Sequence, residues 1–117
     1  MTYDNFTIKA QDAILKAQQI AKGYEHQMVD TPHILKGMIE TDPDVMDFLL
    51  KKSEVNVTAL RQSIDQEIKG YPRIQGQDKQ YLTNEANQAM STAKDYMKDL
   101  GDEYISLEVM LLGILKG

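Results

Sequence analysis

The chain has 117 residues, no cysteine and a net charge of −5, with 42% hydrophobic and 26% charged residues. This length fits one domain, and the composition is typical of a folded globular protein rather than a disordered one. The absence of cysteine excludes disulfides and thiolate ligands, and the negative charge disfavours nucleic acid, whose phosphates need a basic face.

Two helices are predicted in the first third of the chain. Apolar residues recur every three or four positions over residues 8–24, as on one face of an amphipathic helix. Thr7 is placed to cap this helix and Gly23 to end it. The second helix is expected after the cap Asp30, with Pro32 in its first turn. The predicted buried residues are Ala10, Ala13, Ile14, Ala17, Ala21 and Tyr24, then Ile34, Leu35, Met38 and Ile39.

Two further helices are predicted before a long connector. Asp42 and Pro43 open a short third helix, and Asn56 caps a fourth that ends at Gly70. Residues 71–82 have no apolar period and are expected to form a connector, which is long for a loop. The predicted buried residues are Val45, Met46, Leu49 and Leu50, then Val57, Leu60, Ile64 and Ile68.

The last third of the chain predicts a fifth and a sixth helix. Thr83 caps the fifth, Gly101 stops it, and the sixth begins after Ser106. No strand pattern is recognised, so the sequence predicts an all-α fold. The inward residues are expected to be Ala86, Ala89, Met90, Ala93, Tyr96, Met97 and Leu100, then Leu107, Met110, Leu111, Ile114 and Leu115.

A shift of 76 residues aligns the two ends of the chain without a gap. It brings Thr7 onto Thr83, Asp30 onto Ser106 and Gly37 onto Gly113. Any two amphipathic helix pairs share alanines, but caps and glycines in one register favour an internal repeat. We therefore expect one domain over residues 1–117, with a first unit at 6–70, the connector at 71–82 and a second unit at 83–117.

The repeat predicts that the second unit is incomplete. The first unit has four predicted helices and the second has two, so six of eight expected helices are present. The sixth helix is then expected to expose part of its apolar face. That face consists of Leu107, Met110, Leu111, Ile114 and Leu115.

Three residues close in sequence could act as metal ligands, namely His26, Asp30 and His33. The histidines are seven positions apart across a loop, whereas two ligands on one helix face need a spacing of three or four. Asp30 is better explained as a helix cap, and no metal site is expected.

The sequence contains no catalytic motif that we recognise. Neither a GxxxxGK[ST] phosphate loop nor a GxSxG elbow occurs. Adjacent carboxylates are expected on solvated surface or as caps. We therefore expect that this chain is not an enzyme and has no cofactor of its own.

A substrate groove is the main binding hypothesis. Tyr96 and Val109 are placed to line an adaptable apolar groove where the fifth and sixth helices meet, although core packing is the alternative for such residues. Glu108 lies in the first turn of the sixth helix. It is explained either by the helix dipole or by a rim carboxylate that engages a substrate.

Three parts of the sequence resemble the N-terminal domains of Clp ATPases, namely FTIKAQDAILKAQQIA with DTPHILKGMIE, the second copy GDEYISLEVMLLGIL, and the connector YPRIQG. The connector is most similar to that of ClpB disaggregases. The resemblance implies a mobile eight-helix, pseudo-twofold domain tethered to the ATPase modules of a hexamer, which would bind ATP and magnesium. It implies recognition of unfolded or aggregated protein, with an Hsp70-type chaperone system as a partner through other domains. The sequence itself has no secretory signal pattern and no apolar stretch long enough to span a bilayer, so we expect a cytoplasmic protein without a membrane partner.

The resemblance also implies substrate-binding residues. They map onto Thr7, Asp102 and Glu108, with an apolar groove through Tyr96 and Val109. ClpC relatives carry a glutamate where Pro32 stands here, which disfavours a paired phosphoarginine site. An adaptor-docking domain of a ClpC- or ClpA-type unfoldase and a stand-alone helical protein remain as alternatives.

Overall fold

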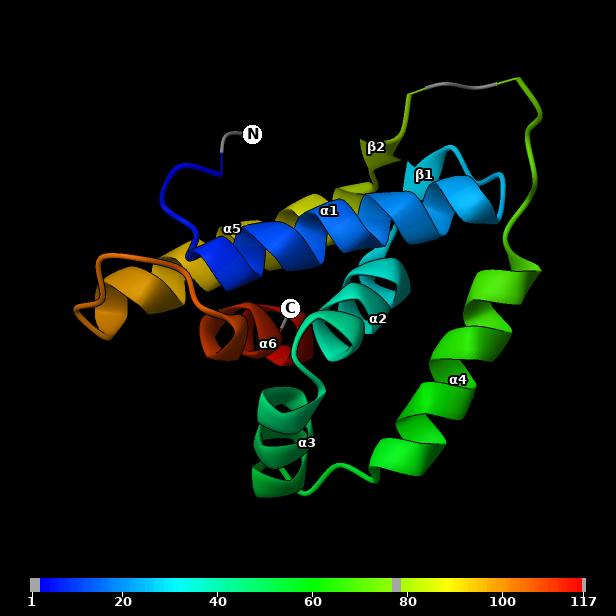
Figure 1. Cartoon of the computed structure of the whole chain (residues 1–117). Coiled ribbons are helices and arrows are strands. Elements are labelled where there is room, and N and C mark those ends of the chain that lie inside the picture. Colours follow the sequence, from blue (N-terminus) through cyan, green and yellow to red (C-terminus); the bar gives the residue numbers. More distant parts are fainter. Residues whose placement is uncertain (1–2, 77–78, 117) are drawn as a thin grey trace.

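A computed structural model describes residues 3–76 and 79–116, and Figure 1 shows its six α-helices and two short β-strands. The elements in chain order are α1 (Ile8–Gly23), β1 (Met28–Val29), α2 (Thr31–Thr41), α3 (Pro43–Lys52), α4 (Val57–Gly70), β2 (Tyr81–Leu82), α5 (Asn84–Asp99) and α6 (Leu107–Lys116). All six predicted helices are confirmed. Residues 77–78 of the predicted connector, and residues 1–2 and 117 of the predicted domain, lie outside the described residues.

The helices begin at the predicted caps. The Thr7 hydroxyl accepts a hydrogen bond from the Ala10 N–H at 3.1 Å, and the Thr83 hydroxyl accepts one from the Ala86 N–H at 3.1 Å. Each bond satisfies a first-turn N–H that has no partner within the helix. The cap side chains of the other four helices accept equivalent backbone bonds, and they belong to Asp30, Asp42, Asn56 and Ser106.

The prediction that no strand would occur was wrong. β1 and β2 pair in parallel, with Val29 opposite Leu82, and a separate bridge joins Phe6 to Ile105. A shift of 76 residues aligns Phe6 with Leu82 and Val29 with Ile105. The β1–β2 pair and the Phe6–Ile105 bridge are therefore counterparts in the two units. Strands of two residues are too short to show an alternating apolar pattern, which explains why sequence periodicity missed them.

Two glycines allow the helix pairs to pack closely. α1 packs mainly on α2, and α5 packs mainly on α6. A Cβ on Gly37 would lie 2.4 Å from the Ala13 carbonyl oxygen, and one on Gly113 would lie 2.4 Å from that of Ala89. Both pairs therefore need glycine at the crossing point, and they make the same contact at positions 76 apart.

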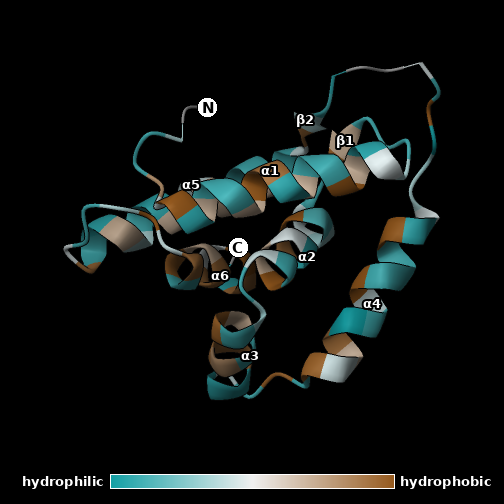
Figure 2. Cartoon of the chain, in the orientation of Figure 1, coloured by the Kyte–Doolittle hydropathy of each residue, from teal (hydrophilic) through white to brown (hydrophobic). Residues whose placement is uncertain are grey.

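The apolar face of α6 is partly exposed, as predicted, but only toward its C-terminal end. Leu107, Met110 and Leu111 are at most 5% exposed, while Ile114 is half-buried and Leu115 is exposed. α6 packs against α5 and also contacts α1 and α2, so most of its apolar face is enclosed within the described helices. Figure 2 shows the hydrophobic residues of α6 beneath α1 and α5.

Two other residues were placed wrongly in the predicted core. Val45 on α3 is 41% exposed and Leu100 after α5 is 58% exposed. α3 and α4 extend away from the other helices, and α4 packs chiefly on α2 (Figure 1). Only Ile64 and Ile68 of α4 are fully buried, so this helix is attached along a narrow face.

Candidate functional site

An open groove of about 810 Å³ lies between the start of α1, the start of α6 and the length of α3. Its apolar lining consists of Ile8, Val45, Phe48, Leu49 and Leu107. Leu49 and Leu107 belong to the buried core and form part of the lining. Ile8 is 78% exposed and Phe48 is 65% exposed, so the walls present apolar surface to solvent.

The caps explain why the groove has this shape. Thr7 and Ser106 end the turns that lead into α1 and α6, and both cap residues line the groove. The Thr7 N–H donates to the Ile105 carbonyl at 2.9 Å, which holds the two helix starts together. Asp42 caps α3 by accepting the Val45 N–H at 3.2 Å, so α3 begins beside the same opening.

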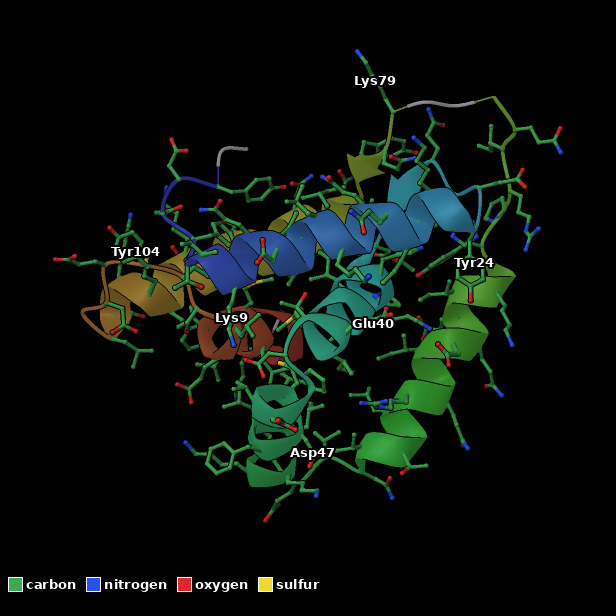
Figure 3. All side chains as sticks on the ribbon, viewed as in Figure 1. Lys9, Tyr24, Glu40, Asp47, Lys79 and Tyr104 are labelled. Carbon is green, nitrogen blue, oxygen red and sulfur yellow. The ribbon has the colours of Figure 1, made fainter. Side chains whose placement is uncertain are left out.

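Two ion pairs border the groove. Lys9 on α1 pairs with Asp42, and Figure 3 shows the Lys9 side chain pointing from α1 toward α3. The Lys52 ammonium lies 3.7 Å from a carboxylate oxygen of Glu108. The hydrogen bond from Lys9, followed by that from the Val45 N–H, lowers the pKa of Asp42. Two cations therefore face two anions, and the rim of the groove carries no net charge.

The structure brings only two of the five predicted substrate-binding residues to this groove. Thr7 and Glu108 line it. Asp102 lies in the turn between α5 and α6, where its N–H donates to the Met97 carbonyl at 2.9 Å. Asp102 is exposed there, and it is not among the residues that line the groove.

Tyr96 and Val109, the residues of the predicted apolar groove, do not line this opening. Tyr96 is half-buried and packs against the core from α5. Val109 is 1% exposed, so its side chain has almost no surface for a substrate. Successive residues on a helix point about 100° apart, and this turns Val109 inward while its neighbour Glu108 faces the rim.

The most exposed apolar residues of the groove, Ile8 and Phe48, were not among the predicted site residues. Both are large apolar residues outside the periodic face of their helix, where solvent normally selects polar side chains. Each residue could have been recognised in the sequence, because it is apolar but falls outside the buried face of its helix. Single exposed apolar residues are common, so the signal needs spatial clustering to carry weight.

The residues considered as metal ligands form a structural polar cluster. Asp30 caps α2 as predicted, and His33 completes the capping box. The two histidines do meet, with His26 Nδ1 3.0 Å from His33 Nε2. Within residues 3–76 and 79–116, no group of three or more histidine or acidic side chains is arranged to hold a metal ion.

The model of the Clp repeat (R) N-terminal domain family matches residues 5–117. The chain belongs to this family. Two chaperone proteins ClpB are similar to it, one from Bacteroides thetaiotaomicron at 33% identity over 98% of this chain, and one from Bacillus anthracis at 34% over 96%. The chain spans only 13% of the length of each relative.

Solved structures show the Clp N-domain fold as well. The N-terminal domain of Hsp104 from Candida albicans matches 97% of this chain with a TM-score of 0.84 at 20% identity, over 75% of its own length. The N-terminal domain of ClpD from Arabidopsis thaliana matches 97% with a TM-score of 0.71 at 25% identity, over 77% of its own length. In the described part of this Clp N-terminal domain, no helix combines the length and apolarity that crossing a bilayer requires.

Proposed function

We propose that this Clp N-terminal domain binds apolar segments of unfolded or aggregated polypeptides in the groove between α1, α3 and α6. The observation that carries the proposal is the clustering of Ile8, Val45 and Phe48, which come from two separate helices and expose apolar surface to one opening. Clustered apolar surface on a soluble domain is characteristic of an interaction site.

The character of the groove favours loosely specified ligands. Its rim is neutral and its opening is wide, so contact with apolar side chains supplies most of the binding free energy. Unfolded chains expose such side chains in many sequences. A groove without a deep specificity pocket binds many of them weakly, which suits a module that captures diverse substrates.

Thr7 and Glu108 are the polar residues proposed to contact the bound chain. Glu108 is more than half exposed, and the Lys52 ammonium lies 3.7 Å from its carboxylate. A competing donor can easily replace Lys52 in such an exposed ion pair. A backbone N–H or a basic side chain of the substrate can take that place. Asp102, Tyr96 and Val109 are not part of this proposed contact surface.

For the whole protein, we propose a ClpB-like disaggregase in which this domain passes substrate to an ATPase ring. The support is the family membership and the ClpB relatives, each of which is far longer than this chain. The reading frame beyond residue 117 tests this part directly. A GxxxxGK[ST] motif downstream is expected, and a different downstream domain would overturn the assignment.

The groove is tested by titrating a fluorescent, permanently unfolded casein against the domain. Phe48→Ser is expected to weaken binding about fivefold to tenfold, as for a partly buried interface aromatic. Leu15→Ser is the matched control, because Leu15 is a 55% exposed apolar residue that does not line the groove. Equal affinity of the wild type and Phe48→Ser would remove the groove from consideration.

A further inference from the structure

The neutral tautomers of two buried histidines follow from their hydrogen bonds. His26 is 1% exposed and His33 is 0% exposed. The Asp30 N–H donates to His33 Nδ1 at 2.9 Å, so the ring proton of neutral His33 must be on Nε2. His33 Nε2 then donates to His26 Nδ1 at 3.0 Å, which leaves the proton of His26 on Nε2.

Neither ring can accept a second proton without breaking this arrangement. A proton on His26 Nδ1 would face the N–H of His33, and a proton on His33 Nδ1 would face the N–H of Asp30. Within the described part of the chain, His26 Nε2 also has no hydrogen-bond partner. The folded geometry therefore admits only the neutral pair.

The charged groups around the pair give little support to an imidazolium. Burial lowers the pKa of His33 to about 4, helped by His26 and opposed by Asp30. Burial, and then the charge of Arg73 in the connector, lower the pKa of His26. Among the described groups that shift these two pKa values, Asp30 is the only carboxylate. Its oxygens already accept hydrogen bonds from the Thr31 N–H and the Tyr71 hydroxyl.

The pair is covered by the segment that follows α4. The Tyr71 ring stacks on His33 with centroids 5.2 Å apart and meets His26 edge-on at 5.6 Å. The Tyr71 hydroxyl donates to Asp30 Oδ2 at 2.8 Å. On the other side Tyr24, at the end of α1, stacks on His26 at 5.5 Å. Displacing Tyr71 would uncover both histidine rings.

The remaining ionisable neighbours act on Tyr71 rather than on the histidines. Burial, and then the hydrogen bond to Asp30, raise the pKa of Tyr71, and the charges of Glu67 on α4 and Glu85 on α5 raise it further. Tyr71 therefore stays neutral throughout the pH range in which a histidine titrates. The pH response of this corner is set by His26 and His33.

The segment that Tyr71 anchors is attached to the rest of the fold along a narrow face. α4 is fully buried only at Ile64 and Ile68, and it packs chiefly on α2. Beyond Tyr71, the connector is tied to the end of α1 by the Ile74 N–H, which donates to the Glu25 carbonyl at 2.9 Å. By contrast, the α1–α2 and α5–α6 pairs pack along their lengths.

We propose that the His26–His33 pair is a proton-sensitive clasp, which releases Tyr71 together with α4 and residues 72–74 when either histidine is protonated. The α1–α2 and α5–α6 pairs stay folded. This inference does not depend on what the groove binds. It assigns a conformational response to a cluster that the proposed function does not use.

The expected pH dependence follows from proton linkage. The open state binds protons with an ordinary histidine pKa of about 6.5, whereas the closed state remains neutral, so closure is progressively weakened as the pH falls below that value. When the pH falls from 7.5 to 5.5, each histidine raises the equilibrium constant between the open and closed states about tenfold. The two together raise it about a hundredfold.

Two NMR measurements on the wild-type domain test the proposal. Long-range ¹H–¹⁵N spectra at pH 7.5 should show both rings protonated on Nε2. Amide exchange, corrected for its intrinsic pH dependence, should show the protection of Ile74 falling about a hundredfold from pH 7.5 to 5.5. Ala17 within α1 serves as the internal reference and should lose far less protection.

The variant His26→Asn supplies the matched control, because its Oδ1 can replace Nδ1 as acceptor and it does not titrate. The fall in Ile74 protection should then shrink to about tenfold. A proton on Nδ1 of either ring, a normal histidine pKa in the folded protein, or unchanged Ile74 protection would each overturn the clasp. If the variant does not fold, the two wild-type measurements decide the question.

Discussion

The hydroxyl of Thr83 donates a hydrogen bond to Oδ1 of Asp30 at 2.7 Å, so the residue that caps α5 holds the residue that caps α2. Asp30 also accepts bonds from the Tyr71 hydroxyl and the Thr31 N–H. Burial opposes ionisation of Asp30, but the hydrogen bonds from Thr83, Thr31 and Tyr71 outweigh it and lower its pKa. The start of the second helix pair is thereby fixed to the first.

Thr83→Ala is expected to destabilise the domain more than Thr7→Ala. Each change removes a cap worth about 1 kcal/mol, but only Thr83→Ala also removes a bond to the half-buried Asp30 carboxylate, worth about 1.5–3 kcal/mol. Urea unfolding at pH 7 measures both variants. Equal losses would show that the bond between the two caps contributes nothing to stability.

Gly37→Ala is expected to cost about 2–3 kcal/mol of unfolding free energy, because the new methyl group would press against the backbone of α1. Gly113→Ala should behave alike, since its Cβ meets the backbone of α5 at the same distance of 2.4 Å. Gly23→Ala is the control. Its Cβ meets no atom within 4 Å, and thermal unfolding should show no loss of stability.

Glu25→Gly is expected to stabilise the domain by about 1 kcal/mol, because Glu25 adopts a left-handed backbone that costs an L-residue about 1–2 kcal/mol. Its φ is 61°, and the counterpart in the second helix pair is Gly101 with φ 74°. Gly101→Ala should lose a similar amount. Chemical denaturation of both variants measures whether each change in unfolding free energy has the expected sign. A loss of stability in Glu25→Gly would contradict the backbone strain at Glu25.

Val109→Ala should separate structural residues from binding residues. Because the side chain is 1% exposed, its truncation is expected to cost on the order of 2 kcal/mol of stability. Affinity for the unfolded casein should not change at a temperature where the variant is folded. A selective loss of binding would instead support the substrate-binding role predicted from the sequence.

The helices and their caps were predictable because both depend on local chemistry. A threonine or aspartate before a periodic apolar segment satisfies free first-turn N–H groups wherever it occurs, and Thr7 and Asp42 do so here. The match of Gly37 with Gly113 was likewise visible in the sequence. The reason for this match is the close contact of the two glycines with α1 and α5, which the sequence alone does not reveal.

The candidate groove was less predictable, because it depends on how separate helices meet. Val45 has the period of a buried residue, yet it faces the groove, since α3 extends away from the main helix pairs. Phe48 lies off that period and is also in the groove. The contact between His26 and His33 arises from a loop closure, and residue spacing does not encode it.

The two ion pairs at the groove have a further consequence for its width. Asp42 precedes α3 and Lys52 ends it, so each end of this helix is tied to a different neighbour, α1 through Lys9 and α6 through Glu108. Lys9, Lys52 and Glu108 are well exposed, so added salt screens their attraction. The distance between the groove walls should then vary with ionic strength, and bulkier segments should gain affinity in 0.5 M salt over 0.05 M salt, roughly spanning this screening range. A groove with fixed walls would show no such size dependence, so on this account ionic strength would select among bound segments by their size.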